Sequence, residues 1–184
     1  FFRTVLPWWL AWYVIPRCTR EVATPDEARA AVAALLPEHP DVVKITVDEI
    51  AGFEPRLPAD VLGALVAAAH AGHVRAVAHI GHSSEALDAV RAGIDALLHD
   101  VYVEDISAEA VAAVAAAHVP VAATLAIFDA VEGSTSARAD FLPLEREVGH
   151  PAVLAALASG PRSFDARPFA PFAQTVRAAH DARR

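Results

Sequence analysis

The sequence is poor in several residue types that would support particular folds or sites. It has 184 residues, with one cysteine, no methionine and eight glycines. A lone Cys18 excludes an intrachain disulfide and any zinc or iron–sulfur site built from several cysteines. No G-x-G-x-x-G or Walker loop follows an apolar run, which argues against folds that bind phosphate groups through a glycine-rich loop. There is no basic cluster, and 15 lysines and arginines face 23 acidic residues, which argues against nucleic acid or an anionic membrane as partner.

What the chain has in abundance is alanine, with 43 residues, and hydrophobic residues make up 55% of the total. This composition favours helices and excludes disorder as a description of the whole chain. The length suits one domain that buries a real core. Because the first residue is Phe1 rather than methionine, we expect the chain to be a piece of a longer protein.

The N-terminal segment, residues 1–18, is apolar and aromatic and is treated as a unit separate from residues 19–184. Its apolar part, Phe1–Ile15, contains Arg3 and Pro7 and is shorter than the roughly 20 residues of a membrane span. It also lacks the features of a signal peptide. We expect a buried strand and loop here. A surface or membrane-associating segment is the alternative, since uncovered tryptophans would form a large apolar patch.

Patterns typical of helices and strands alternate over about a hundred residues. Thr24 and Glu27 form a capping-box signature, for example, and Ser83 or Ser84 is expected to cap the third helix. The intervening runs are short and almost wholly apolar, which is typical of parallel strands buried on both faces. We expect helices over residues 24–36, 58–72, 83–93, 107–117, 151–159 and 168–182, and strands over residues 41–45, 74–79, 94–98 and 119–124. These βα units predict an α/β fold, either a barrel or a doubly wound sheet.

Polar side chains end each of the four apolar runs: Lys44, His79, His99 and Thr124. Because the carboxyl ends of parallel strands line the site in such folds, we expect these residues to converge on one pocket. Two neutral imidazoles are good zinc ligands. A lysine ammonium repels a cation, but carboxylation by carbon dioxide would convert Lys44 into an anionic oxygen ligand.

The order of these strand-end residues resembles the amidohydrolase superfamily, closest to its imidazolonepropionase and prolidase-like branch. The resemblance runs from about Thr24 to Thr124. Its most specific piece is Ala-Gly-Ile-Asp-x-x-x-His, which ends at His99, preceded by Val-Lys44-Ile and Val-Ala-His79. The resemblance implies a TIM-like (β/α) barrel in which Lys44 is a carboxylated bridging ligand on the fourth strand. His79 and His99 would be metal ligands from the fifth and sixth strands.

The sequence departs from that family in two places. It has no His-x-His pair for a first strand, and no strand ending in Asp follows Thr124. A barrel of this kind needs about 250 residues. We therefore expect an internal fragment that covers strands four to seven of a partial barrel, followed by C-terminal helices.

The function implied by the resemblance is hydrolysis of C–N bonds in amides, cyclic amides or small peptides by a zinc-activated water. One or two zinc ions would be held by Lys44, His79 and His99, and the general base would be the missing aspartate, so no catalytic residue is assigned within this chain. His82, Tyr102 and Thr124 are candidate contacts for a small amide or dipeptide substrate, although His82 could instead cap the next helix. We expect a cytoplasmic enzyme, with no membrane partner, that is barely active as the isolated chain. Homo-oligomerisation stays open.

Two other functions remain open from the sequence. Lys44 could form a Schiff base with a carbonyl substrate, because desolvation in an apolar pocket would lower its pKa. Alternatively, the chain could be a non-catalytic scaffold or assembly domain whose aromatic N-terminal segment is an interface.

Overall fold

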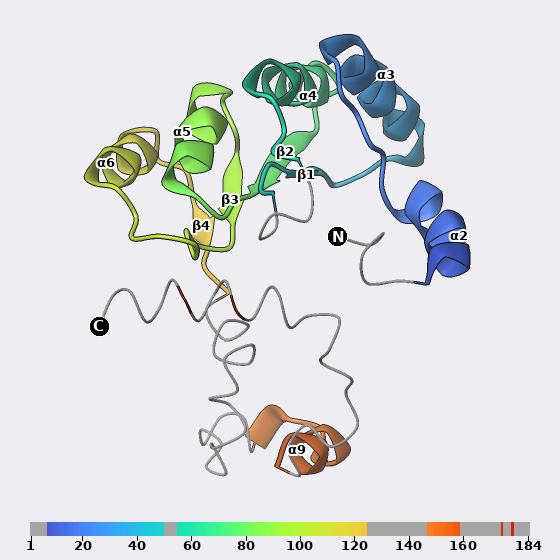
Figure 1. Ribbon diagram of the computed structural model, residues 1–184, viewed down its shortest axis with the longest axis vertical. Helices are drawn as coiled ribbons and strands as arrows, with labels where there is room; N and C mark the ends of the chain where they lie inside the picture. Colours follow the sequence, from blue (N-terminus) through green and yellow to red (C-terminus); the bar gives the residue numbers. More distant parts are fainter. Residues whose placement is uncertain (1–6, 50–54, 125–146, 159–173, 175–177, 179–184) are drawn as a thin grey trace.

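The computed structural model describes residues 7–49, 55–124 and 147–158, together with Gln174 and Ala178. Its centre is a parallel sheet in the strand order β1-β2-β3-β4, with a helix in each crossover (Figure 1). The fold class is therefore α/β, as the alternating pattern predicted. The strands are β1 (Val42–Thr46), β2 (Arg75–His79), β3 (Ala96–Leu98) and β4 (Val121–Ala122).

Each expected strand is present, but most are shorter than the sequence suggested. The run predicted over residues 119–124 forms only the two-residue strand β4. His118 and Thr124, which flank it, have φ values of 53° and 45°, so the backbone leaves the extended region on both sides. Pairing is parallel throughout, with Thr46 opposite His79 and His79 opposite Leu98. The register therefore places Thr46 beside His79, and His99 follows directly after the residue that pairs with His79.

The helix α3 (Pro25–Leu35) begins as its sequence predicts. Thr24 Oγ1 accepts a hydrogen bond from the Glu27 amide at 3.2 Å, and Glu27 Oε2 accepts one from the Thr24 amide at 3.2 Å. This reciprocal capping satisfies donors that have no partner within the helix. The helix tightens into the 3₁₀ helix η1 (Leu36–Glu38) before Pro40.

The helix α3 precedes β1, and the three crossover helices are α4 (Ala59–Ala71), α5 (Ser83–Arg91) and α6 (Ala108–Ala116). Ser107 caps α6 by accepting from the Ala110 amide at 3.1 Å, as expected. The expectation that Ser83 or Ser84 caps α5 is wrong. His82 is the N-cap residue, and both serines lie inside the first turn. Glu85, three residues after His82, has a carboxylate that accepts a hydrogen bond from the backbone amide of His82 at the start of this helix.

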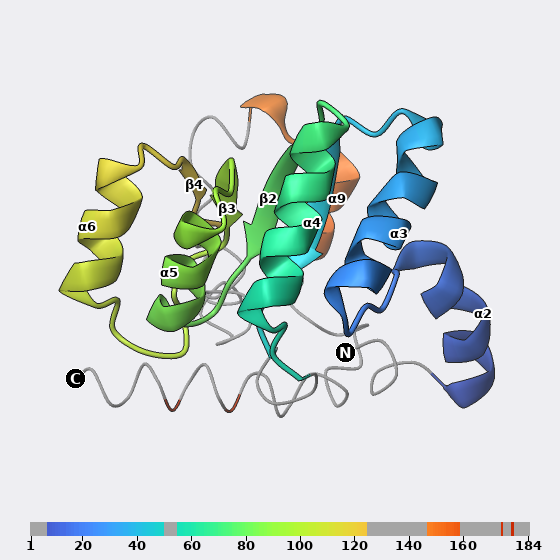
Figure 2. The ribbon, with the colours of Figure 1, turned by 90° about the horizontal axis from the view of Figure 1, so that it is seen from above.

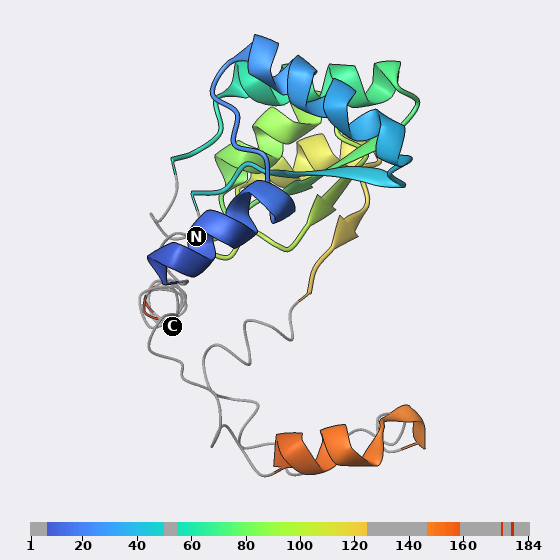
Figure 3. The ribbon, with the colours of Figure 1, turned by 90° about the vertical axis from the view of Figure 1, so that its right-hand side faces the viewer.

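The hydrophobic core lies between the sheet and the helices. Figures 1 and 2 show α3, α4, α5 and α6 side by side over one face of the sheet. Among the residues that the structure describes, Figure 3 shows no such layer of helices on the opposite face, which is called the open face below. Side chains alternate between the two faces along a strand. The strand residues that face the helices are buried: Val43, Ile45, Ala76, Ala78 and Leu97.

The expectation of a buried strand and loop at the N-terminus is wrong for the residues described there. The helix α2 (Trp8–Cys18) begins after Pro7 and buries only Ala11 and Ile15, which are four residues apart on one face. Its aromatic side chains are exposed, with Trp8 at 83%. Uninterrupted apolar sequence does not distinguish a buried strand from a helix with one narrow buried stripe.

The C-terminal region contains one fully described helix, α9 (Pro151–Ala158), which matches the prediction for residues 151–159. The helix predicted over residues 168–182 lies outside the described residues except for Gln174 and Ala178, which are both helical. Among the helices that the structure describes, none is long and apolar enough to cross a membrane.

Candidate functional site

The uncovered face of the sheet carries polar side chains toward the carboxyl ends of its strands. Lys44 and Thr46 alternate with buried residues along β1, and both are exposed. His79 ends β2 directly opposite Thr46 and is partly buried. In parallel α/β folds this edge is where ligands bind. The structure therefore places His79 at the carboxyl end of its strand, whereas Lys44, predicted to end its own, is the middle residue of β1 and lies opposite Val77.

The two candidate histidine ligands are brought into direct contact. The ring centroids of His79 and His99 are 4.3 Å apart, with an interplanar angle of 66°. His99 follows β3 in a left-handed conformation, with φ 71°, and its amide donates to the Ala122 carbonyl at 2.9 Å. That bond anchors the backbone of His99 to β4. The position of the imidazole is thus fixed by neighbouring strands and not by a free loop.

The environment of His99 favours its neutral form. Burial lowers the pKa of His99, and the nearby charges of His79 and Lys44 lower it further. His99 Nδ1 is 2.5 Å from Thr124 Oγ1, which leaves Nε2 outside that hydrogen bond. Three of the four residues identified in the sequence, His79, His99 and Thr124, therefore contact one another in turn along this edge.

Lys44 itself is exposed on the open face of β1. A Schiff-base lysine is activated by desolvation in an apolar pocket. The described part of the chain does not supply that desolvation to Lys44. An accessible amine is, by contrast, suited to reaction with carbon dioxide.

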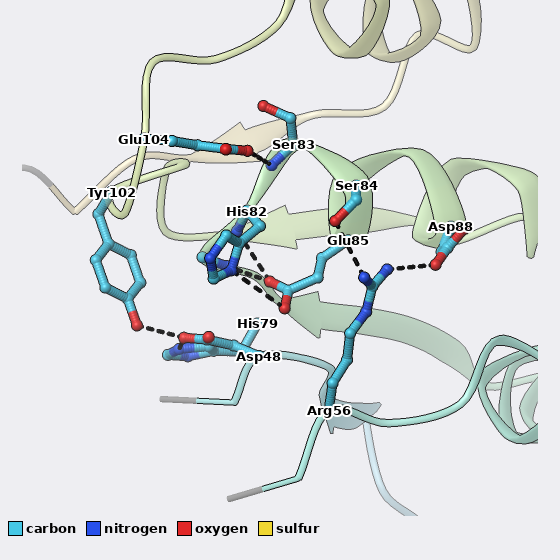
Figure 4. Close-up of polar contacts among 11 residues, drawn as sticks. Asp48, Arg56, His79, His82, Ser83, Ser84, Glu85, Asp88, Tyr102 and Glu104 are labelled. Carbon is cyan, nitrogen blue, oxygen red and sulfur yellow. Dashed lines mark hydrogen bonds and ion pairs between the residues drawn. The ribbon is translucent and has the colours of Figure 1, made fainter. Parts of the chain in front are cut away.

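Asp48 is a site residue that the sequence analysis missed. It lies two residues after β1, is 1% exposed, and its Oδ2 is 3.2 Å from His79 Nε2. The Tyr102 hydroxyl donates a hydrogen bond to the same oxygen (Figure 4). A polar residue directly after the apolar Val47 was the available signal, but it lies beyond the predicted end of the strand.

Tyr102 is buried and directs its hydroxyl toward Asp48. Burial raises the pKa of Tyr102 well above its usual range, and the hydrogen bond to Asp48 raises it further. The phenol is thus held in its protonated, donating form. The Tyr102 amide also donates to the Gly81 carbonyl at 3.1 Å. Tyr102, which the sequence predicted as a substrate contact, thus ties the loop after β3 to Asp48 and Gly81.

A second group of polar residues lies at the start of α5. Glu85 Oε2 accepts hydrogen bonds from the amides of Gly81 at 2.7 Å and His82 at 2.9 Å. His82 Nδ1 is 3.5 Å from Glu85 Oε1. Asp48, His82 and Glu85 each offer one ligand atom within 4.8 Å of the others, which makes them a candidate metal group among the described residues. Figure 4 shows this group beside the Asp48–Tyr102 contact.

The two candidate groups of metal ligands differ in how many of their ligand atoms already make hydrogen bonds within the protein. Glu85 Oε2 is committed to two backbone amides, the arrangement expected of a helix cap. His82 fills the N-cap position that competed with a substrate role in the sequence analysis. In the strand-end group, the ring nitrogens His79 Nδ1 and His99 Nε2 lie outside the hydrogen bonds to Asp48 and Thr124. Both groups are therefore candidates for binding a divalent cation.

Comparisons with known proteins extend this description. No family model matches the sequence, and no curated protein matches it. Solved structures do match. An amidohydrolase is 25% identical, with a TM-score of 0.54, over 77% of this chain and 33% of its own. A Xaa-Pro dipeptidase with methionine bound in its active site is 20% identical, with a TM-score of 0.55, over 87% of this chain and 36% of its own.

A prolidase in complex with N-methylphosphonate-L-proline is also similar, with 20% identity and a TM-score of 0.56 over 85% of this chain. The chain covers 37% of that prolidase and thus spans about a third of the length of the proteins it matches. The parallel βα units agree with these matches. The chain has the fold of part of an amidohydrolase barrel, as the sequence motif predicted.

Proposed function

We propose that this chain is part of a metal-dependent hydrolase that cleaves C–N bonds in small amides or dipeptides. The observation that carries the proposal is the contact between His79 and His99 at the carboxyl ends of adjacent parallel strands. Lys44 lies on the same face, and its charge lowers the pKa of His99. A cluster of two imidazoles and one amine at this edge has no evident role in stabilising the sheet.

The proposed metal ligands are Lys44, His79 and His99. The lowered pKa of His99 keeps its imidazole in the neutral form that binds metal. Carboxylation of Lys44 would replace a repelling ammonium by an anionic oxygen donor, so that the charge of the group matches a cation. A bound divalent metal supplies Lewis-acid activation of water and of the scissile carbonyl.

The remaining residues of the site hold these ligands in place. Thr124 Oγ1 contacts one nitrogen of His99, and the backbone of that histidine is bonded to β4. Such outer contacts fix the orientation of a ligating ring. Thr124, Tyr102 and His82 remain candidate substrate contacts. Of these, Thr124 is the exposed one.

The structural matches support a proposal for the substrate class. Two of the similar proteins are a Xaa-Pro dipeptidase and a prolidase with a proline-bearing phosphonate. We propose dipeptides or small cyclic amides as substrates of the longer protein, and little or no turnover by this chain alone. The proton-transferring carboxylate would lie outside the chain.

Zinc binding by the 184-residue chain tests the proposal directly. We expect the wild type to bind zinc in isothermal titration calorimetry, and more tightly after incubation with bicarbonate. His79→Asn or His99→Asn should weaken binding by more than the roughly 100-fold that loss of an outer partner costs. Lys44→Ala should abolish the bicarbonate effect.

A matched control comes from His73, which is exposed and, like His99, has a positive φ, of 59°. Asparagine tolerates that backbone conformation, so His73→Asn should leave zinc binding unchanged. If His79→Asn and His99→Asn bind zinc like the wild type, the proposed ligands are wrong. Loss of binding in His82→Asn and Glu85→Gln alone would assign the metal to the group at the start of α5.

A further inference from the structure

We propose that Asp48 is a positioning residue that fixes the ring orientation and tautomer of His79. In this role Asp48 accepts the Nε2 proton of His79 and leaves Nδ1 as the nitrogen with a free lone pair. The inference deepens the proposed function and rests on it only for the statement that His79 holds a metal. The tautomer itself is a property of the metal-free chain.

The first step is the position of Asp48. Its side chain is completely buried, and Oδ2 lies 3.2 Å from His79 Nε2. Gly81 packs directly on the carboxylate. A Cβ at that glycine would be 2.8 Å from Asp48 Oδ1 and 2.9 Å from Oδ2. The carboxylate therefore has little room to move away from the imidazole.

The second step is the hydrogen-bonding chemistry. An ionised carboxylate only accepts hydrogen bonds, so the nitrogen that faces it must carry the proton. A neutral imidazole has one N–H and one lone pair, on different nitrogens. Once Nε2 is the donor to Asp48, Nδ1 of His79 is the lone-pair nitrogen. The hydrogen bond made by one ring nitrogen sets the role of the other.

The third step is the part played by Tyr102. Its hydroxyl donates to the same Asp48 oxygen, and its amide donates to the Gly81 carbonyl. Burial and the hydrogen bond to Asp48 keep the phenol protonated. Asp48 follows β1, Gly81 follows β2 and Tyr102 follows β3, so three successive strand ends meet at this carboxylate (Figure 4).

The ring nitrogens of His79 in the metal-free chain provide the decisive measurement. Their ¹⁵N shifts and long-range couplings, recorded about two pH units above the usual histidine pKa of about 6.5, report the tautomer. The His79→Asn variant assigns the signals by their disappearance. We expect the wild type to carry the proton on Nε2. A majority of the Nδ1–H form in the wild type would overturn the inference without any variant.

Asp48→Asn tests whether the carboxylate causes this preference. An amide at such a position accommodates the opposite tautomer, so we expect the Nδ1–H form to become the majority. Zinc affinity should fall about 10- to 100-fold. Tyr102→Phe is the matched control, because it removes a hydroxyl from the same oxygen but keeps the carboxylate. It should retain the wild-type tautomer and lose less than about 10-fold in zinc affinity.

The outcomes separate this inference from the proposed function. A wild type that binds no zinc would contradict the proposed function, while the tautomer measurement would still decide the role of Asp48. A wild type that binds zinc, with an unchanged tautomer and affinity in Asp48→Asn, would show that Asp48 only stabilises the fold. Circular dichroism of each variant establishes that it is folded before the two measurements are compared.

Discussion

The two faces of the β1–β4 sheet differ in composition and burial although they belong to the same four strands. The helix-covered face is built from small or branched apolar residues, such as Val43, Ala76 and Leu97, which are at most 5% exposed. The open face carries Lys44 and His79. Packing against four helices requires apolar surface, whereas the open face is free to hold polar groups.

This difference shows how stability and chemistry are separated within one element. Because side chains alternate in direction, a single residue step along a strand moves from the core to the site. Ile45 belongs to the core and Lys44 to the open face, for example. Substitutions on one face should therefore change folding, and substitutions on the other should change ligand binding.

Leu97 and Leu98 test the comparison most strongly, because they are neighbours in β3 that face opposite ways. Leu97 is 1% exposed in the core, and Leu98 is half-buried on the open face. Leu97→Ala should lower the free energy of unfolding by about 2–5 kcal/mol. Leu98→Ala should cost about 1 kcal/mol, because less apolar area is lost and no closed cavity forms. Urea denaturation measures both. Equal costs would mean that the open face is covered in solution.

Substitutions of two glycines, Gly81 and Gly63, should change the free energy of unfolding by intermediate amounts. Gly81→Ala would place a methyl group 2.8 Å from the carboxylate of Asp48, which is held by its own partners. We expect a loss of about 1–3 kcal/mol in unfolding free energy from this overpacking. Gly63→Ala in α4 has nothing within 4 Å of the new Cβ and should gain up to about 1 kcal/mol. A neutral Gly81→Ala, measured by the same denaturation, would show that Asp48 can move.

Substitution of Asp95 should have the smallest effect on the free energy of unfolding. Asp95 lies just before β3, at the amino-terminal end of the strands and away from the site. It accepts from the Ala76 amide at 2.7 Å and contacts His70 Nε2 at 2.8 Å. Burial would raise the pKa of Asp95, but these two partners outweigh it and hold that pKa below its usual value. The stabilisation is therefore present above the unfolded pKa of about 3.9 and is lost as the pH falls through the folded value.

Asp95→Asn should cost about 1 kcal/mol at neutral pH, and the difference from the wild type should shrink below about pH 4. Asp26→Asn is the control, because Asp26 is almost fully exposed in its ion pair with Arg29. It should change stability by less than about 0.5 kcal/mol. Thermal unfolding over a range of pH measures both. A difference for Asp95→Asn that persists in acid would contradict the assigned linkage.

Local signals predicted most of the fold. The capping box of α3 and the serine cap of α6 are read from neighbouring residues, and both are present. The prediction for the α5 start is wrong because serine is a common cap, whereas here His82 is the N-cap residue and Glu85 accepts from the amides of Gly81 and His82. The N-terminal aromatic segment was misjudged because an apolar run carries no information about which neighbours cover it.

The part of the candidate site that could be predicted is the part formed by residues at the carboxyl ends of adjacent strands. His79 and His99 come into contact because adjacent parallel strands bring their carboxyl ends to one edge, whereas Lys44 pairs with Val77, two residues before His79. Asp48 could not be predicted in the same way, because its place in the site depends on a contact with Tyr102, 54 positions away along the chain. No local pattern marks such a pair.

The sequence by itself determined the α/β alternation, the parallel sheet and the identity of the residues at the strand ends. These depend on periodicity, capping and turn chemistry, which act over a few residues. Only the tertiary structure decided which face of the sheet is covered, how the two imidazoles meet and which groups surround Asp48. Those features arise from packing between segments distant in the chain, where burial and hydrogen bonding depend on the whole arrangement.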